Sequence, residues 1–155
     1  MRLRWAALAA AVFTALVLVV PSVASAARRP LFAAMNGRNE IANGDRGAGD
    51  RNGGGSFSAV IDGRELCYGL TVRDIEDPVA AHIHRGGANV NGPIVVPLES
   101  LPVSGDPGSS AGCTTLSRRL VRQIRGNPGG FYVNVHTDNF PDGAIRGQMF
   151  SRGGP

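Results

Sequence analysis

The stretch that decides the fold is residues 129–149, GGFYVNVHTDNFPDGAIRGQM. Residues 131–137 alternate with a period of two, as in a β-strand with one apolar face and one polar face. The apolar positions are Phe131, Val133 and Val135, and the polar positions are Tyr132, Asn134 and His136. This alternation predicts an extended strand rather than a helix.

The second half of the same stretch predicts a partner strand. Pro141, Asp142 and Gly143 form a turn signal, because Pro fixes φ and Gly tolerates a positive φ. Residues 144–150 then resume the extended pattern. Ile145 and Met149 share one face of this run, and Arg146 and Gln148 share the other. The whole stretch is therefore expected to form a β-hairpin with a medium-length loop.

Residues 56–72 predict a second hairpin. Asp62-Gly63 lies between two alternating runs, which is the strongest short-range hairpin signal. If these two residues form the loop, Ile61 opposes Arg64 and Phe57 opposes Tyr68. The resulting apolar face consists of Phe57, Ala59, Ile61, Leu66, Tyr68, Leu70 and Val72. Two alternations that agree in one register specify the pairing strongly.

Shorter segments complete the predicted fold. Further strands are expected at residues 31–35, 79–84 and 94–96, and loops rich in Gly, Asn and Pro at 36–55, 85–93 and 101–112. The first loop is expected to be long, mobile and on the surface. One helix is expected at 114–125, where apolar residues recur at helical spacing. The predicted fold is an all-β, Greek-key-like antiparallel β-sandwich or barrel with one short helix.

The amino terminus of the 155-residue chain resembles a secretory signal. A short basic start precedes an apolar run over residues 5–20, and Ala24-Ser25-Ala26 supplies a small-residue cleavage pattern. A membrane anchor is the alternative, for which the run is at the lower limit of length. We expect a signal peptide at 1–26, a disordered lead-in at 27–30, one domain at 31–151 and a disordered tail at 152–155. The mature protein is expected to be secreted, either free in the medium or associated with the cell envelope, without a membrane partner.

The two cysteines, Cys67 and Cys113, both lie in the predicted exported part. In an oxidising compartment an even pair predicts a disulfide. A pair of metal-binding thiolates is the alternative, but the two residues lack the close spacing of such sites. We expect the disulfide to connect the 56–72 hairpin to a later loop.

The three histidines all lie on predicted strands. His82 and His84 stand two residues apart and therefore project from one face, about 7 Å apart at Cα. Two imidazoles so placed can share a zinc or copper ion, and His136 can supply a third ligand if its strand is adjacent. Asp74, Asp77 and Asp138 in the flanking loops are candidate additional or outer ligands. The alternative is structural: imidazoles that hydrogen-bond to nearby loops, with Asn134 and Arg146 bracing the sheet, and no cofactor.

Other candidate motifs carry less chemistry. Residues 108–112 match G-x-S-x-G, but a nucleophile elbow needs a strand before it and an acid followed by a histidine after it. Here residues 102–107 begin and end with Pro, the chain is too short for that fold, and His136 comes before Asp138. We therefore expect a flexible loop there and no enzyme activity. Arg118, Arg122 and Arg125 line one side of the predicted helix, either as a solvated face or as a strip for anionic glycans or phosphates. No aromatic residues interleave with basic ones, so nucleic acid is not an expected partner.

Several motifs together resemble the CHRD domain, which is named for chordin and also occurs as a single-domain exported bacterial protein. They are Asn39-Glu40-Ile41, Ala81-His82-Ile83-His84, residues 92–98 (GPIVVPL), residues 130–137 (GFYVNVHT) and residues 143–148 (GAIRGQ). The chain departs from the usual Asn-Glu-Val-Pro-Pro of the family at Ile41-Ala42-Asn43. The resemblance implies an extracellular β-sandwich with no settled enzymatic activity. In chordin the domain sits in an antagonist of secreted growth factors, a role that fold alone does not transfer.

Two functions follow as hypotheses. The first is a non-catalytic extracellular binding or structural module whose partner is an extracellular protein or a glycan. The alternative is a copper- or zinc-binding domain that uses His82, His84 and His136, loosely similar to the copper centre of Cu,Zn superoxide dismutase. That enzyme uses more histidines than the three present here, so dismutase activity is not expected.

Overall fold

The computed structural model describes residues 29–42, 44–99, 101–102 and 108–152. Strands make up most of its regular structure. In chain order the elements are β1 (Leu31–Asn36), η1 (Gly37–Asn39), β2 (Ile41–Ala42), β3 (Asp45–Arg46), β4 (Gly54–Asp62), β5 (Glu65–Arg73), β6 (Ala80–Arg85), β7 (Ile94–Pro97), β8 (Gly108–Thr115), α1 (Arg118–Gly126), η2 (Pro128–Gly130), β9 (Phe131–His136), β10 (Ile145–Gln148) and β11 (Phe150–Ser151). The predicted signal peptide at 1–26 lies outside the described residues, as do half of the predicted lead-in and most of the predicted tail.

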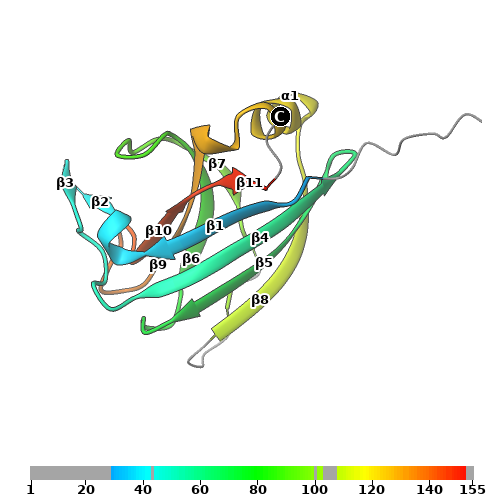
Figure 1. The fold of residues 1–155 in the computed structure, drawn as a ribbon. Coiled ribbons are helices and arrows are strands. Elements are labelled where there is room, and N and C mark those ends of the chain that lie inside the picture. The colour runs from blue at the N-terminus through cyan, green and yellow to red at the C-terminus, as the bar shows by residue number, and fades with distance from the viewer. Residues whose placement is uncertain (1–28, 43, 100, 103–107, 153–155) are drawn as a thin grey trace, which may run out of the picture.

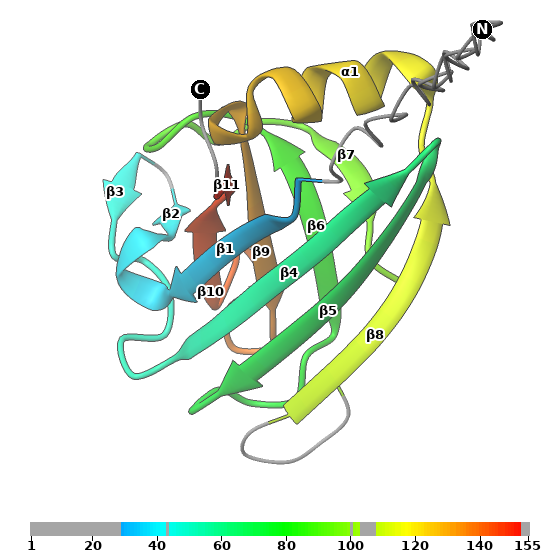
Figure 2. The ribbon, with the colours of Figure 1, turned by 45° about the vertical axis from the view of Figure 1, so that its right-hand side comes forward.

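One antiparallel sheet forms the body of the protein. Its strand order is β7-β6-β9-β10-β1-β4-β5-β8, and β11 pairs with β1 beside β10. The sheet curls into a half-barrel, and α1 lies across one end of it (Figures 1 and 2). The predicted all-β antiparallel fold with one helix is confirmed. Within the described residues, no helix has the length and apolar character needed to cross a membrane.

The hydrophobic core fills the inside of the curl. Phe57 and Leu66 from one half of the sheet and Ile83 and Val133 from the other belong to the same buried cluster. Val121 and Ile124 of α1 join this cluster, which explains why the helix seals that end. A sheet curled in this way buries one face of its strands. The apolar side chains that recur at every second position therefore point into the core.

The β4–β5 hairpin has the predicted buried face but a different register. Asp62 pairs with Glu65 and Ile61 with Leu66, so the turn residues are Gly63 and Arg64 rather than Asp62 and Gly63. Gly63 has a φ of +55° at the first central position, where a type II′ turn requires a positive φ. The slip is two residues, and a shift of two preserves which side chains face the core.

Residues 108–115 correct two predictions. They form strand β8 at the edge of the sheet, whereas the sequence predicted a flexible loop followed by a helix starting at residue 114. The helix begins later, at Arg118, where the Ser117 side chain caps it by accepting a hydrogen bond from the Leu120 N–H. The G-x-S-x-G match therefore lies in an edge strand. The sequence of this strand shows no clear period-two pattern, because Gly, Ser and Ala differ too little in hydrophobicity to distinguish the two faces.

The disulfide is formed between Cys67 and Cys113. The two residues lie directly opposite each other on β5 and β8, so the bridge joins two paired strands rather than a hairpin and a loop. It lies on the outer face of the half-barrel, opposite the core face on which Leu66 and Tyr68 are buried. The alternative of two metal-binding thiolates is thereby excluded.

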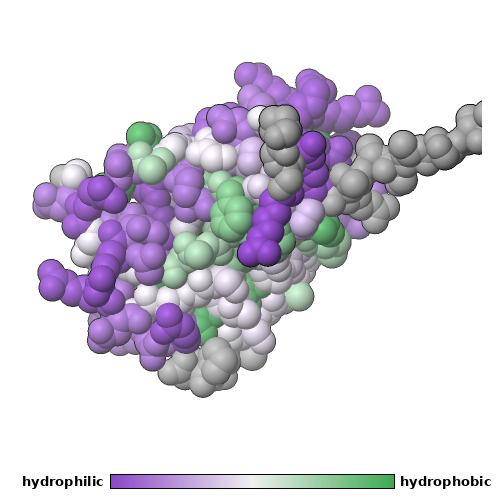
Figure 3. Space-filling model, viewed as in Figure 1, coloured by the Kyte–Doolittle hydropathy of each residue, from purple (hydrophilic) through white to green (hydrophobic). Residues whose placement is uncertain are grey.

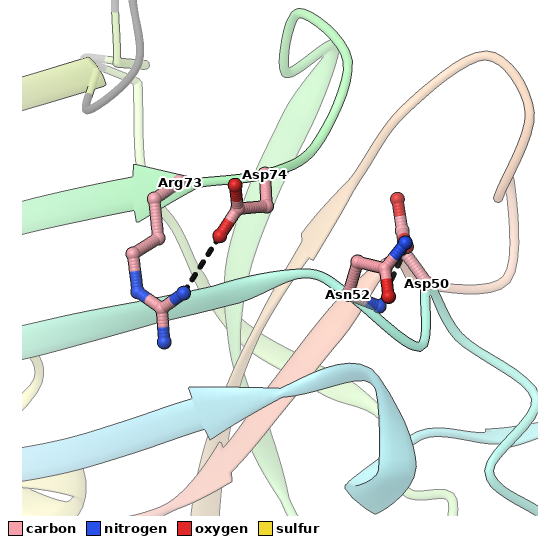
Figure 4. A network of polar contacts seen from close by, with 4 residues as sticks. All are labelled: Asp50, Asn52, Arg73 and Asp74. Atoms are coloured by element: carbon pink, nitrogen blue, oxygen red, sulfur yellow. Dashed lines mark hydrogen bonds and ion pairs between the residues drawn. The ribbon is translucent and has the colours of Figure 1, made fainter.

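The predicted surface loop at residues 36–55 is more ordered than its composition suggests. It contains η1 and the two-stranded β2–β3 ribbon, and its last two residues already belong to β4. Glu40 and Ile41 are buried. Backbone hydrogen bonds hold the segment to the body, including Asp50 N–H to the Ala144 carbonyl oxygen. Figure 4 shows Asp50 accepting from the Asn52 N–H in this segment, beside the Arg73–Asp74 ion pair at the end of β5.

Candidate functional site

The outer face of β6, β9 and β10 is buried, although it is lined with polar side chains. Tyr132 and Asn134 on β9, Arg146 on β10 and His84 on β6 are all buried on this face. The loop after β6 covers it, because Asn91, Gly87 and Val90 receive hydrogen bonds from the Arg146 guanidinium. Buried polar groups require partners, so this face is the most chemically specific part of the molecule.

Three histidines converge at one end of this face. His82 and His84 project from β6, and His136 ends the neighbouring strand β9. Each offers one ring nitrogen such that all three nitrogens lie within 4.8 Å of one another. The Nδ1 of His82 and the Nε2 of His136 are 3.1 Å apart. The geometry thus brings His136 beside the His82–His84 pair, a condition that the sequence left open, whereas Asp74, Asp77 and Asp138 do not join the group.

The hydrogen bonds of two rings define their tautomers. His84 Nδ1 lies 2.8 Å from the Gly92 carbonyl oxygen, and His136 Nδ1 lies 2.9 Å from the Pro141 carbonyl oxygen. A carbonyl oxygen can only accept, so each Nδ1 carries the proton and donates it. In the neutral rings this leaves the Nε2 lone pairs of His84 and His136 pointing elsewhere. His136 Nε2 accepts from His82 Nδ1–H, whereas the buried His84 Nε2 has no hydrogen-bond partner in the described part of the chain.

Burial and the neighbouring imidazoles favour the neutral form of His82 and His84. Burial, followed by the nearby His136 and His84, lowers the pKa of His82 from its ordinary value of 6.5 to about 4. Burial is also the main reason that the pKa of His84 lies below its ordinary value. Neutral imidazole is the form that binds metal ions, so burial favours the binding form of His82 and His84.

A stack of aromatic and cationic groups supports His84. The His84 ring stacks on the Tyr132 ring with centroids 4.8 Å apart, and the Arg146 guanidinium carbon lies 3.4 Å from the centre of the Tyr132 ring. The Tyr132 hydroxyl accepts a hydrogen bond from the Gly92 N–H, the residue whose carbonyl orients His84. Gln148 extends the network by donating from Nε2 to the carbonyl oxygens of Gly86, Gly129 and Phe131. The rings are therefore held from several strands at once.

A second buried group lies next to the stack. Glu40 is only 1% exposed, and burial raises the pKa of its carboxyl above the ordinary value. The Asn134 amide lies between Glu40 and His84 and influences the pKa of both. Among the described residues, Glu40 Oε2 and Asn134 Oδ1 have no hydrogen-bond partner, and neither does Thr137 Oγ1 directly after β9. Like His84 Nε2, each of these buried atoms has unused hydrogen-bonding capacity.

Sequence patterns identified some of these residues and missed others. The alternation predicts that Tyr132, Asn134 and His136 share one face of their strand and that Arg146 and Gln148 share one face of theirs, as observed. The sequence predicts that Glu40 lies in a surface loop, whereas it is buried. The Asn39-Glu40-Ile41 motif is the sequence feature that singles out this residue. The carbonyl groups of Gly92 and Pro141 had no sequence signal, because any residue can supply a backbone acceptor. A second group with ligand-type side chains, Glu65 with Cys67 and Cys113, holds no free thiolate because its sulfurs form the disulfide.

Fold and site together define a small antiparallel β module with a buried polar face and a histidine cluster. Residues 31–149 match the model of the CHRD domain, which covers most of the chain, so the protein belongs to the CHRD domain family. The resemblance identified from the sequence motifs is thereby confirmed. No curated protein and no solved structure matches the chain.

Proposed function

We propose that this protein is a non-catalytic extracellular module that binds one zinc or copper ion through His82, His84 and His136. The observation that carries the proposal is the convergence of three ring nitrogens within 4.8 Å. Two of these rings donate Nδ1–H to backbone carbonyl oxygens, which is the outer-shell arrangement typical of metal-binding histidines.

The spacing supports a tetrahedral site that keeps one open position. Zn–N bonds of about 2.0 Å place two ligand nitrogens roughly 3.3 Å apart. His82 Nδ1 and His136 Nε2 are 3.1 Å apart, so a metal ion could take the place of the hydrogen bond between them if the His82 proton moved from Nδ1 to Nε2. His84 Nε2 needs a small ring movement to reach the same ion. Binding there would give the buried Nε2 the partner that it lacks among the described residues.

The charge around the cluster favours a cation. The segments before β6 and after β9, residues 74–79 and 137–143, contain five carboxylates and no basic residue. These segments lie beside His136, because Val79 N–H donates to the His136 carbonyl oxygen and Asn139 Nδ2 donates to Glu76 Oε1. Carboxylates near a neutral nitrogen cluster raise the local concentration of metal cations. Their role here is attraction, since none of them lies within ligand distance of the three rings.

Calorimetric titration with Zn²⁺ and Cu²⁺ tests the metal site. We expect one ion per chain and a raised melting temperature, because a ligand that binds only the folded state stabilises it. Binding should disappear in a His82→Asn/His136→Asn variant. The chain has no other histidine besides His84, so the variant leaves a single imidazole. Asp138→Asn is the matched control, since it removes a nearby charge and should weaken binding only slightly.

The contrary result would be the same heat and the same melting temperature in the wild-type protein and the double variant. The three imidazoles would then have a structural role, and the module would act through other surfaces. Binding of more than one ion per chain with unchanged affinity in the variant would also contradict the proposal.

The extracellular part of the proposal rests on separate support. The Cys67–Cys113 disulfide fits an oxidising compartment, and the basic and apolar amino terminus with Ala24-Ser25-Ala26 fits an export signal. Expression of the full chain in a bacterial host with an export system tests it. A protein recovered outside the cytoplasm that begins at Ala27 supports export, whereas an uncleaved cytoplasmic product contradicts it.

A further inference from the structure

The end of the molecule covered by α1 carries a concentration of arginine. The elements that form this end are the β4–β5 turn, the end of β6 and α1. They contribute Arg64, Arg85, Arg118, Arg119, Arg122 and Arg125, against only two carboxylates, Asp62 and Glu65. We call these six residues the arginine face. In Figure 3 the surface over α1 is strongly hydrophilic.

Folding explains only part of this concentration. Arg64 Nε donates to the Leu116 carbonyl oxygen and Arg125 donates to the Ile61 carbonyl oxygen, so these two side chains fasten the helix to the hairpin. Arg118, Arg119 and Arg122 are exposed and make no side-chain hydrogen bond or ion pair to another described residue. Arg118 and Arg119 lie in the first turn, where the helix dipole disfavours a positive charge. Their charges therefore do not stabilise the helix.

A groove of about 360 Å³ adjoins the same residues. Arg85, Arg122, Gln123 and Asn127 provide its polar lining, and Phe131 lies beneath it. The Arg85 guanidinium is held over the Phe131 ring, 5.1 Å from its centre, and donates to Gln123 Oε1 at 2.8 Å. A guanidinium fixed in this way keeps further N–H groups for a ligand and loses less entropy on binding.

The surroundings favour a hydrated partner over an apolar one. The exposed large apolar side chains among the described residues are Val60, Val79, Val90, Ile94 and Phe150, and none belongs to α1 or the groove. Phe131 is only 3% exposed, so it offers no ring on which a base can stack. A protein interface normally has an apolar centre, and a bilayer needs an inserted apolar side chain. Among the described residues, the arginine face has neither an apolar centre nor an exposed large apolar side chain that could insert.

We infer that the arginine face binds an acidic polysaccharide, with guanidinium groups pairing to its carboxylate or sulfate groups. Arg118, Arg122 and Arg125 are spaced at i, i+4 and i+7 and so form a stripe about 10 Å long on one side of α1. The groove with Arg85 lies beside this stripe. A flexible polyanion can therefore contact several guanidiniums along its length, which suits the planar, two-pronged geometry of arginine.

The test is calorimetric titration of the metal-free protein with heparin and alginate oligosaccharides at 50 and 150 mM NaCl. The informative variant is Arg118→Gln/Arg119→Gln/Arg122→Gln, which leaves the two structural arginines unchanged. The matched control is Arg38→Gln/Arg46→Gln/Arg51→Gln, which removes the same charge from exposed arginines of the 36–55 segment. We expect the first variant to bind at least tenfold more weakly with a smaller salt dependence, and the control to stay within twofold of wild type.

Several outcomes would overturn the inference. They are no binding to either oligosaccharide at 150 mM NaCl, equal weakening in both triple variants, and equally tight binding to phosphatidylglycerol vesicles or to single-stranded DNA. The His82→Asn/His136→Asn variant should bind the oligosaccharides as wild type does. Failure of the metal site would therefore leave this inference intact, and the reverse also holds.

Discussion

The two hairpins of this protein use the same backbone geometry for different purposes. In β4 and β5, buried and accessible residues alternate almost without exception, so only the inner face is buried. In β9 and β10 the outer face is buried as well, with Asn134 and Arg146 among the least exposed side chains of the described chain. The first hairpin is a wall of the core, and the second carries a polar layer on its back.

The difference shows that burying polar groups costs stability on the outer face of β9 and β10 but not on that of β4 and β5. An outer face of Ser, Thr and Gly in contact with water needs no special partners, whereas buried Arg146 and Glu40 need compensation for the water that they lose. Such groups are retained where position matters more than stability. Here Arg146 holds the loop whose Gly92 carbonyl orients His84, so the polar layer helps to position the histidine cluster.

The largest expected effect comes from Arg146→Met. This change removes the donor to Asn91, Gly87 and Val90 and leaves buried Glu40 without its nearby positive charge. We expect a loss of about 3–5 kcal/mol of unfolding free energy. Ser58→Ala on the exposed outer face of β4 should change it by less than about 0.5 kcal/mol. Urea unfolding of both variants measures the contrast, and similar small losses would show that the polar layer is not structural.

The disulfide on the regular half should come next. Cys67 and Cys113 are 46 residues apart, and a cross-link over such a separation stabilises by about 3–4 kcal/mol in the chain-entropy model. The Cys67→Ser/Cys113→Ser variant is expected to lose that amount while retaining the chemical shifts of the three histidines. Thermal melting and a histidine NMR spectrum provide the two readings. Histidine shifts that move with the disulfide would mean that the two halves are not independent.

Acid should destabilise the polar half by a smaller amount. Because the pKa of His82 falls from 6.5 to about 4 on folding, the unfolded chain binds a proton between these values that the folded protein does not. Stability is therefore complete above pH 6.5, declines as the pH falls towards 4, and is flat for this group below 4. Allowing for partial exposure, the decline is about 2 kcal/mol. His84 acts in the same direction.

The comparison that isolates this effect is wild type against His82→Asn in the presence of a chelator. The variant should show a shallower pH dependence between pH 6.5 and 4. Parallel curves for the two proteins would mean that His82 titrates normally in the folded state.

The smallest effect is expected from Tyr132→Phe. The substitution keeps the ring that stacks on His84 and removes only the hydroxyl that accepts from Gly92 N–H at 3.2 Å. About 1 kcal/mol of stability should be lost. Metal affinity should fall as well, because the same residue, Gly92, orients His84. A stability loss with unchanged metal affinity would show that the loop containing Gly92 does not position His84 for metal binding.

The inner half of this structure could be predicted from sequence, and much of the outer layer could not. The core faces of β4, β5 and β9 follow from alternation, which survives even the two-residue error at the Asp62–Glu65 turn, because faces repeat every two residues. β8 was missed because its Gly, Ser and Ala residues lack apolar contrast. The spacing of His82 and His84 predicts that they share one face, whereas the sequence leaves open whether His136 lies beside them. The orientation of His84 and His136 depends on carbonyl groups of Gly92 and Pro141, and tertiary packing rather than residue type brings those groups into place.

The most direct test of the central claim is X-ray absorption at the metal edge of the protein loaded with one equivalent of Zn²⁺. We expect three imidazole nitrogens at about 2.0 Å, with a fourth position filled by a small ligand such as water. A shell made mainly of oxygen atoms, or one that contains a single imidazole, would show that the metal binds elsewhere. In that case His82, His84 and His136 would be structural residues of the polar layer.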